Sequence, residues 1–372
     1  MIYLDHAATT PLDGEVLKTY IEMLEEYGNP SSLHQMGKRA QKFLRQAREG
    51  IAGLFNVDDR EVYFTSGATE SNNWALISQS LSHREAFGQD EIIASSLEHP
   101  AVNKTLDYLE GLGFKVHFVD PRDGDIQVED FLNKTTDRTC GWVCMAVNNE
   151  TGSILPIEAL GEEAKDRKIY FHVDGVQGTA LPSLDLQKVF FTSLTCSGHK
   201  LYGPKGQGFL MTKNLKRPLT PFHHGGGQEF GLRPGTVDVP GAVALCKALE
   251  IAYKRAEADA KDDEILRETC IEKLRDAGVD FEVNELKRQS PRILSLWIKG
   301  VPAQELLMKM DIGGICLSAG SACSAGALKS SQVIERMYPE DLNRGSESLR
   351  LSFGRGNTLE DLDSLVRILA KG

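Results

Sequence analysis

VFFTSLTCSGHK, residues 189–200, joins a buried-strand pattern to a short polar turn. Residues 189–196 are mainly apolar or small, which is typical of a strand covered on both faces of a sheet. The turn that follows holds Ser197, His199 and Lys200. A hydroxyl, an imidazole and an amine just beyond a buried strand predict a ligand site at the carboxyl end of that strand.

A second apolar stretch, IYFHVDGVQ (169–177), ends in an acid. Asp174 closes the strand pattern 26 residues before Lys200, and Gln177 follows in the next turn. A single lysine after a strand is usually a solvated residue, but an acid-ended strand combined with a lysine-ended strand is uncommon. A lysine amine can carry pyridoxal phosphate (PLP) as a Schiff base, and an acid can hold the proton of its pyridinium ring. Together the two stretches predict a PLP site.

Strand-like and helix-like segments alternate from about residue 60. The strand patterns lie at 61–65, 91–96, 115–120, 141–147, 169–174, 190–196 and 208–212. This alternation predicts an α/β fold with a mainly parallel sheet. A long helical pattern after Pro240 leads to a smaller α+β region, with strands in RILSLWIK (292–299) and ESLRLSFG (347–354). We expect a large PLP-binding domain at 15–250 and a small domain built from 1–14 and 251–372.

The charge balance argues against nucleic acid or a membrane as a main partner. The chain has 42 basic and 53 acidic residues, a formal net charge of −11 and no dense cluster of cations. No apolar run approaches the ~20 residues that span a bilayer. The first residues, MIYLDHAATTPLDG, lack the basic start and apolar stretch of a signal peptide. We therefore expect a cytoplasmic protein.

Seven cysteines are scattered without a C-x-x-C pair, so neither a disulfide framework nor a zinc site is expected. The adjacent His223 and His224 would point apart, so no metal is expected there either. Cys323 differs from the others because it lies in LSAGSACSAGALKSS (317–331), a stretch of small residues. An accessible cysteine in such a stretch can act as a nucleophile, whereas Cys316, beside apolar neighbours, is expected to be inert.

Further polar residues follow other strand patterns. SGAT (66–69) stands between a strand and a helix, where free N–H groups can cradle an anion. His99 and Asn149 follow the strands at 91–96 and 141–147. Arg350 lies in the strand pattern ESLRLSFG, and its guanidinium is suited to binding a carboxylate. Each residue alone is more often structural. Their shared place at strand ends favours cofactor and substrate binding.

Ten motifs fall in the order found in cysteine desulfurases, a family that the sequence resembles over nearly its whole length. They are YLDHAATT, GNPSSLH, FTSGATESNN, EHPAV, NNETG, HVDGVQ, SGHK, GGGQE, RPGT and SAGSACSAG. More narrowly, the sequence is similar to the subgroup that serves iron–sulfur assembly and nitrogenase maturation. The resemblance implies a PLP-dependent transferase of fold type I that works as a homodimer.

The resemblance also implies how the cofactor is held. Lys200 would form the Schiff base and move the substrate proton, while Asp174 would hold the pyridinium proton. His99 would stack on the ring, and Gln177 would contact its phenolate oxygen. From its place after a strand, Asn149 could also bind that oxygen or the substrate. The phosphate would be bound by Thr69, Ser197 and His199, with Thr236 reaching the phosphate held by the partner subunit.

For the substrate, the resemblance implies that Arg350 and Asn149 bind the carboxylate of L-cysteine and that Cys323 attacks its sulfur. The products would be L-alanine and a persulfide on Cys323, delivered to a sulfur-acceptor protein such as an iron–sulfur scaffold. Alternatives stay open: a lyase for selenocysteine or cysteine sulfinate, which would not need the thiol, or a non-catalytic scaffold for sulfur-transfer partners. An aminotransferase is also possible, but it would leave the cysteine stretch without a purpose.

Overall fold

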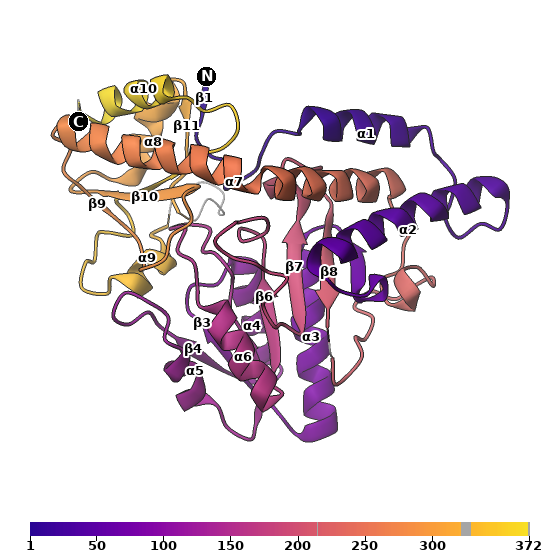
Figure 1. The fold of residues 1–372 in the computed structure, drawn as a ribbon. Coiled ribbons are helices and arrows are strands. Elements are labelled where there is room, and N and C mark those ends of the chain that lie inside the picture. The colour runs from indigo at the N-terminus through magenta and orange to yellow at the C-terminus, as the bar shows by residue number, and fades with distance from the viewer. Residues whose placement is uncertain (214, 321–328, 371–372) are drawn as a thin grey trace.

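The computed structural model describes residues 1–213, 215–320 and 329–370, and a seven-stranded sheet forms the centre of this part of the chain (Figure 1). Its strands are β2 (Val62–Thr65), β3 (Glu91–Ser95), β4 (Lys115–Val119), β5 (Thr139–Val143), β6 (Tyr170–Asp174), β7 (Ser193–Ser197) and β8 (Gly208–Thr212). They lie in the order β2-β8-β7-β6-β5-β3-β4, and only β8 runs antiparallel to its neighbours. The expected α/β fold with a mainly parallel sheet is confirmed.

Helices cover both faces of this sheet, which explains why its five inner strands are buried along their whole length. On one face lie α3 (Ala68–Phe87) and α4 (Pro100–Gly111); on the other lie α2 (Gln35–Phe55), α5 (Val128–Lys134), α6 (Ile157–Arg167) and part of α7 (Val239–Asp276). Alternate residues of β3 divide between the two cores. Ile92 and Ala94 pack in the core that includes α4, whereas Ile93 packs in the core that includes α6.

Two expected strands of the central sheet differ by more than one residue from those observed. β5 ends at Val143 rather than at 147, because Val147 forms a bridge with Ile154 in the loop that follows. β7 begins at Ser193 rather than at 190. The carboxyl ends of both strands still lie at the edge of the sheet where the candidate residues follow.

A smaller α+β unit lies beside the large sheet (Figure 1). It contains the sheet β12-β10-β9, the pair β1-β11 and three helices. Their bounds are β1 (Ile2–Tyr3), β9 (Phe281–Val283), β10 (Ile293–Ile298), β11 (Ile315–Cys316), β12 (Ser348–Ser352), α8 (Ala303–Ile312), α9 (Gln332–Met337) and α10 (Leu359–Leu369). The first part of α7 packs in the large core and its last part in the small one, together with Leu4. The expected domain boundary after residue 250 stays a prediction.

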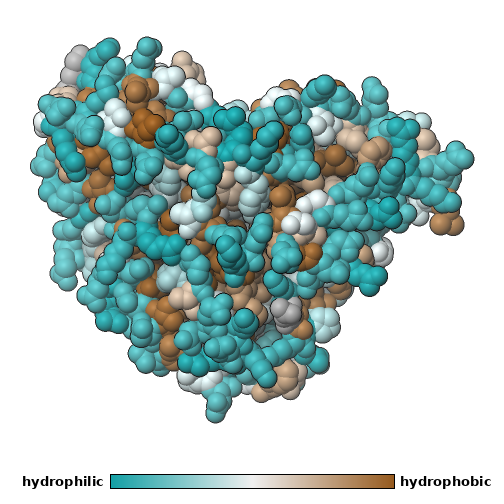
Figure 2. Space-filling model, in the orientation of Figure 1, coloured by the Kyte–Doolittle hydropathy of each residue, from teal (hydrophilic) through white to brown (hydrophobic). Residues whose placement is uncertain are grey.

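The remaining elements are α1 (Gly14–Leu24) and three short 3-10 turns, η1 (Asp59–Glu61), η2 (Gly198–Lys200) and η3 (Glu229–Gly231). Helices α1 and α2 extend beyond the sheet as an arm (Figure 1), and hydrophobic residues lie at its outer end as well as at several other places on this face (Figure 2). Within the described residues, no helix has the length and apolar character needed to cross a membrane.

A buried ion pair anchors the glycine-rich segment 223–236 to the large domain. Arg48 of α2 contacts Glu229 at 2.5 Å, and the two side chains are 7% and 1% exposed. The second carboxylate oxygen of Glu229 accepts the backbone N–H of Phe64 at 2.8 Å. Glu229 and Phe230 both have left-handed φ angles, 45° and 59°. The ion pair therefore holds a strained turn in place.

Replacing Arg48 with methionine should lower the free energy of unfolding by about 3–5 kcal/mol, because Glu229 would become an unpaired buried charge. Chemical denaturation followed by circular dichroism measures this change. Arg122→Met is the matched control, since Arg122 pairs with Asp130 at 3.3 Å on the surface, where its side chain is 58% exposed. Equal losses in the two variants would contradict a stabilising role for the buried pair.

Candidate active site

One cavity of about 510 Å³ gathers most of the residues singled out in the sequence. It lies at the carboxyl ends of β3, β5, β6 and β7. Its walls include Thr69, His99, Asn149, Asp174, Gln177, Ser197, His199, Lys200 and Arg350. Thr236 is exposed and does not line this cavity, and Cys323 lies outside the described residues. Residues from segments far apart in the chain thus meet in one place.

The amine of Lys200 is held by the N-terminal segment, whose residues 7–9 line the cavity. Its Nζ donates to the carbonyl oxygens of Ala7 at 2.6 Å and Ala8 at 2.7 Å. The amide of Gln177 donates to the same Ala7 oxygen at 3.0 Å. The sequence reasoning assigned no site residue to this segment. Its contribution comes from backbone carbonyls, which carry no residue-type signal.

Asp174, at the end of β6, accepts a hydrogen bond on each carboxylate oxygen. The amide of Asn72 donates to Oδ2 at 2.8 Å, and the backbone N–H of Val176 donates to Oδ1 at 3.1 Å. Hydrogen bonds from N–H donors favour the charged form of a carboxyl group. Asp174 is therefore placed as a negative group at the floor of the cavity.

The start of α3 forms an anion cradle in the same cavity. Gly67, the N-cap residue, has φ +143° and makes no side-chain capping bond. A Cβ at Gly67 would lie 3.6 Å from the Ser197 hydroxyl, while a Cβ at Gly208 would lie 2.6 Å from the Gly67 Cα. Both glycines keep the backbone close to the hydroxyl. Together with the Thr69 side chain and the positive end of the helix dipole, this geometry fits a phosphate group.

Two histidines in the wall are neutral at ordinary pH. Burial, with the nearby Lys200 and Lys205, lowers the pKa of His199 to about 4. Burial also lowers the pKa of His99, and Asp174 opposes that effect. The Nδ1 of His99 accepts the backbone N–H of Ala101 at 3.0 Å. This bond fixes the ring at the start of α4, where it can face a planar ring.

Arg350 approaches the cavity from β12 of the small unit. Its guanidinium contacts Asp5 at 2.8 Å and donates to the backbone oxygen of Asn149 at 3.0 Å. Its Nε is buried and has no hydrogen-bond partner among the described residues. A donor left without a partner beside a cavity is suited to a carboxylate ligand.

Two buried acids near the cavity were not found from the sequence. Glu98 accepts the hydroxyl of Ser95 and the backbone N–H of Met145 on Oε1, while its Oε2 has no partner among the described residues. Burial raises the pKa of Glu98 to about 8, and the charge of Asp174 adds to the shift. Burial also raises the pKa of Glu150, which accepts the Ser331 hydroxyl at 2.5 Å. In the sequence both look like ordinary surface acids.

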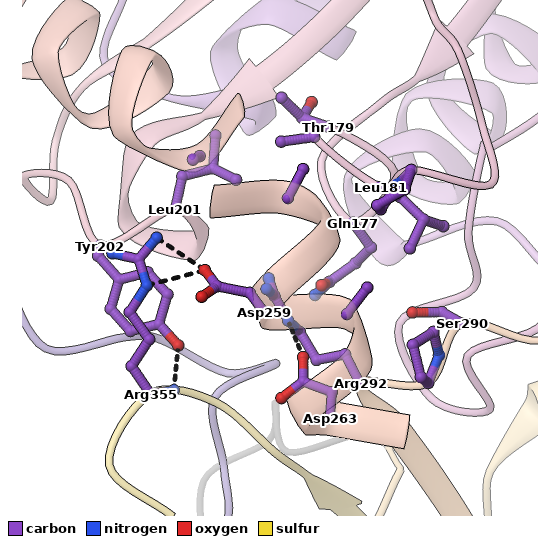
Figure 3. A pocket seen from close by; sticks show the side chains of 16 residues that line it. Gln177, Thr179, Leu181, Leu201, Tyr202, Asp259, Asp263, Ser290, Arg292 and Arg355 are labelled. Atoms are coloured by element: carbon purple, nitrogen blue, oxygen red, sulfur yellow. Dashed lines mark hydrogen bonds and ion pairs between the residues drawn. The ribbon is translucent and has the colours of Figure 1, made fainter. Parts of the chain in front are cut away.

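Gln177 also borders a second, much smaller cavity of about 30 Å³ where α7 meets the small unit (Figure 3). There Asp263 pairs with Arg292 at 3.3 Å, and Asp259 pairs with Arg355 at 2.8 Å (Figure 3). Gln177, in the loop after β6, therefore borders both the cavity that holds Lys200 and the small cavity lined by these two ion pairs.

His6, which follows Asp5 in the N-terminal segment, is buried away from the cavity. His6 is 3% exposed and packs between the rings of Tyr3 and Tyr202, at centroid distances of 5.1 and 6.0 Å. It does not line the cavity. Among the described residues, no three His, Cys, Asp or Glu side chains are grouped to hold a metal ion.

A lysine and an acid at adjacent strand ends, beside a phosphate cradle, define a PLP-dependent enzyme. The sequence matches the aminotransferase class-V family over residues 2–365. It is 39% identical to the putative cysteine desulfurase IscS 1 of Bacillus subtilis (strain 168), over 99% of this chain and 97% of that protein. The chain belongs to the cysteine desulfurase family, which confirms the resemblance seen in the motifs.

Solved structures agree with this assignment. A NifS-like protein superimposes with a TM-score of 0.91 at 32% identity, covering 100% of this chain and 98% of that one. A structure described as SspA in complex with cysteine gives a TM-score of 0.83 at 30% identity, over 96% of this chain and 100% of that one. The cofactor of the family is PLP, and the donor set of the cavity fits it.

Glu98→Gln should change how stability depends on pH. Folding raises the pKa of Glu98 from 4.5 to about 8, so the folded protein keeps a proton that the unfolded chain releases. The contribution of Glu98 to stability is therefore complete below pH 4.5 and is lost as the pH rises toward 8. The neutral variant should become more stable relative to the unmodified protein over this range, by up to about 1.4 kcal/mol per pH unit.

Urea titrations at several pH values between 4.5 and 8 measure this difference. Glu162→Gln is the control, because Glu162 lies on the surface near Lys165 with its side chain 66% exposed. A difference for Glu98→Gln that stays constant with pH would show that Glu98 is ionised in the folded protein.

Proposed function

We propose that this protein is an L-cysteine desulfurase in which Lys200, Asp174, Arg350 and Cys323 carry the reaction. It converts L-cysteine to L-alanine and leaves the sulfur on Cys323 as a persulfide. The main support is that one cavity brings together a lysine amine, a buried carboxylate and an arginine N–H that has no partner among the described residues. One related structure, SspA, holds cysteine.

Seven of the predicted residues would hold the cofactor. Lys200 would bind it covalently, Asp174 would pair with its ring nitrogen, His99 would stack on the ring and Gln177 would contact its phenolate oxygen. Thr69, Ser197 and His199 would bind the phosphate beside the start of α3. Bound PLP supplies an electron sink for the electron pair released when the substrate loses its Cα proton.

The chain's own groups would bind the substrate and move that proton. The Nε–H of Arg350, which has no partner among the described residues, would hold the carboxylate of L-cysteine together with the Asn149 side chain and fix the position of its Cα. Lys200 would take the proton from this carbon. The carbonyl oxygens of Ala7 and Ala8 stabilise the resulting ammonium group, since they already accept hydrogen bonds from Nζ.

Sulfur transfer requires a nucleophile at the open side of the cavity. Gly320 lines the cavity and is the last described residue before the segment that holds Cys323. The Cys323 thiolate would attack the substrate sulfur, forming an S–S bond as the C–S bond breaks and its electron pair goes to the carbon. Protonation of that carbon, together with return of a proton from Lys200 to Cα, would then give L-alanine. The persulfide remains for a sulfur-acceptor protein.

We also propose a homodimer. Helix α1 exposes Leu17, Ile21 and Leu24 on one side, with 45%, 56% and 56% of each residue accessible. A row of exposed leucines and isoleucines favours contact with another protein surface. Thr236, exposed and outside the cavity of its own chain, would reach the phosphate bound by the partner subunit.

Cys323→Ala should abolish sulfide release from L-cysteine in the presence of a reductant while PLP binding stays unchanged. The reason is that the sulfur would have no acceptor in the first half of the reaction. Sulfide and alanine assays measure both products, and absorbance measures bound PLP. Cys316→Ala, which removes the other cysteine of this region, should keep full activity. Undiminished turnover in Cys323→Ala would instead favour a lyase that acts without the thiol.

Arg350→Lys should raise the KM for L-cysteine by about tenfold or more, because an ammonium group cannot replace the planar fork of a guanidinium on a carboxylate. Lysine keeps a positive charge beside Asp5, so the fold should be retained. Steady-state kinetics measure KM, and absorbance titration measures PLP affinity, which should be unchanged. An unaltered KM would remove Arg350 from the substrate site.

A further inference from the structure

A buried hydrogen-bond chain runs from Asp174 into the core of the large domain. Asn72 of α3 donates to Asp174 at 2.8 Å. The Oδ1 of Asn72 meets the His172 Nε2 at 2.9 Å and accepts the Thr195 hydroxyl at 2.8 Å. The Nδ1 of His172 meets the Ser193 hydroxyl at 2.7 Å. Asn72, His172, Ser193 and Thr195 are each 0% exposed.

Tyr170 extends this chain at its far end. Its hydroxyl lies 2.6 Å from the Ser193 oxygen, and burial raises its pKa above the ordinary value. Burial lowers the pKa of His172 to about 3, so the imidazole is neutral and has one N–H. The phenol therefore keeps its proton and His172 has only one proton to donate.

These facts give every bond a direction. The Asn72 Nδ2 donates to Asp174, so its Oδ1 can only accept, and the single N–H of His172 must be on Nε2. Nδ1 then accepts from Ser193, and the Ser193 oxygen accepts from Tyr170. The reversed Asn72 amide would put its oxygen against the Oδ2 of Asp174, so that two acceptors would face each other. With the N–H toward Asp174, the Thr195 hydroxyl and the His172 Nε2–H both donate to Oδ1 and stabilise this orientation.

We propose that Asn72 is a positioning residue that keeps Asp174 ionised, so that a proton shared with the cofactor ring stays on the ring nitrogen, and that His172 holds Asn72 in this orientation. The inference rests on the proposed pairing of Asp174 with PLP. Without the Asn72 N–H, a buried carboxyl group would favour its neutral form. The shared proton would then move toward Asp174, and the ring would lose the positive charge that makes it an electron sink.

The ¹⁵N NMR shift of ring-labelled PLP bound to the protein reports directly where this proton lies, whatever the activity. The unmodified protein should show a protonated ring nitrogen. Asn72→Ala should move the signal toward the unprotonated value and weaken PLP binding by about tenfold to a hundredfold, the loss expected for a hydrogen bond to a charged group. Thr105→Val is the matched control, because it removes a buried hydrogen bond, 2.8 Å long, to the Ala101 carbonyl.

A pair of variants at His172 separates the orienting role from simple packing. Glutamine can place its side-chain N–H where the imidazole Nε2–H lies, so His172→Gln should keep the protonated signal. His172→Phe fills similar space without a donor and should shift the signal in the same direction as Asn72→Ala. If Asn72→Ala does not fold, this pair decides, and Thr195→Val, which removes the second donor to Oδ1, gives the same comparison.

The outcomes distinguish this inference from the proposed function. An unshifted ¹⁵N signal with PLP affinity within about twofold of the unmodified protein, in Asn72→Ala or in His172→Phe, would overturn the role of Asn72. An unprotonated ring nitrogen in the unmodified protein would instead show that Asp174 does not hold that proton, and the proposed site itself would be wrong.

Discussion

The parallel pairing of β6 with β7 is the constraint on which the site depends. His172, Val173 and Asp174 stand opposite Ser193, Leu194 and Thr195. This register brings the acid at the end of one strand beside the turn that holds Lys200 after the other. Because side chains alternate along a strand, a slip of one residue would turn Asp174 to the opposite face of the sheet. Asn72 reinforces the register, since it bonds to side chains of both strands.

The N-terminal segment joins the small unit to this rigid edge. Asp5 contacts Arg350 of β12, while the next residues supply the carbonyl oxygens that hold Lys200. Thr10 donates both its backbone N–H and its hydroxyl to the His199 carbonyl, at 2.9 and 3.0 Å. The amine and the arginine are therefore fixed relative to each other through the short segment from Asp5 to Ala8. A small movement of that segment would change both sides of the cavity together.

The sequence predicted those parts of the site that depend on the chemical nature of a side chain and on its place at the end of a strand. Lys200 and Asp174 follow apolar runs that are apolar because helices cover both faces of the sheet, so the strand ends could be located. The carbonyls of Ala7 and Ala8 could not be found, because a backbone oxygen looks the same in every residue. Asn72 could not be identified from the sequence, because it lies in a helical stretch of mostly polar residues. Only the fold shows that its side chain contacts Asp174 and is not exposed to solvent.

Two buried acids, Glu98 and Asp174, differ in where their hydrogen-bond donors lie. Glu98 and Asp174 both lie in a region of low dielectric, and their mutual repulsion favours leaving one of them neutral. Both donors to Glu98 meet the same oxygen, and its Oε2 has none among the described residues. Asp174 instead receives one N–H on each oxygen, from Asn72 and Val176. The Asn72 amide therefore gives the acid at the cavity floor a donor on the oxygen that Val176 does not reach, whereas burial raises the pKa of Glu98.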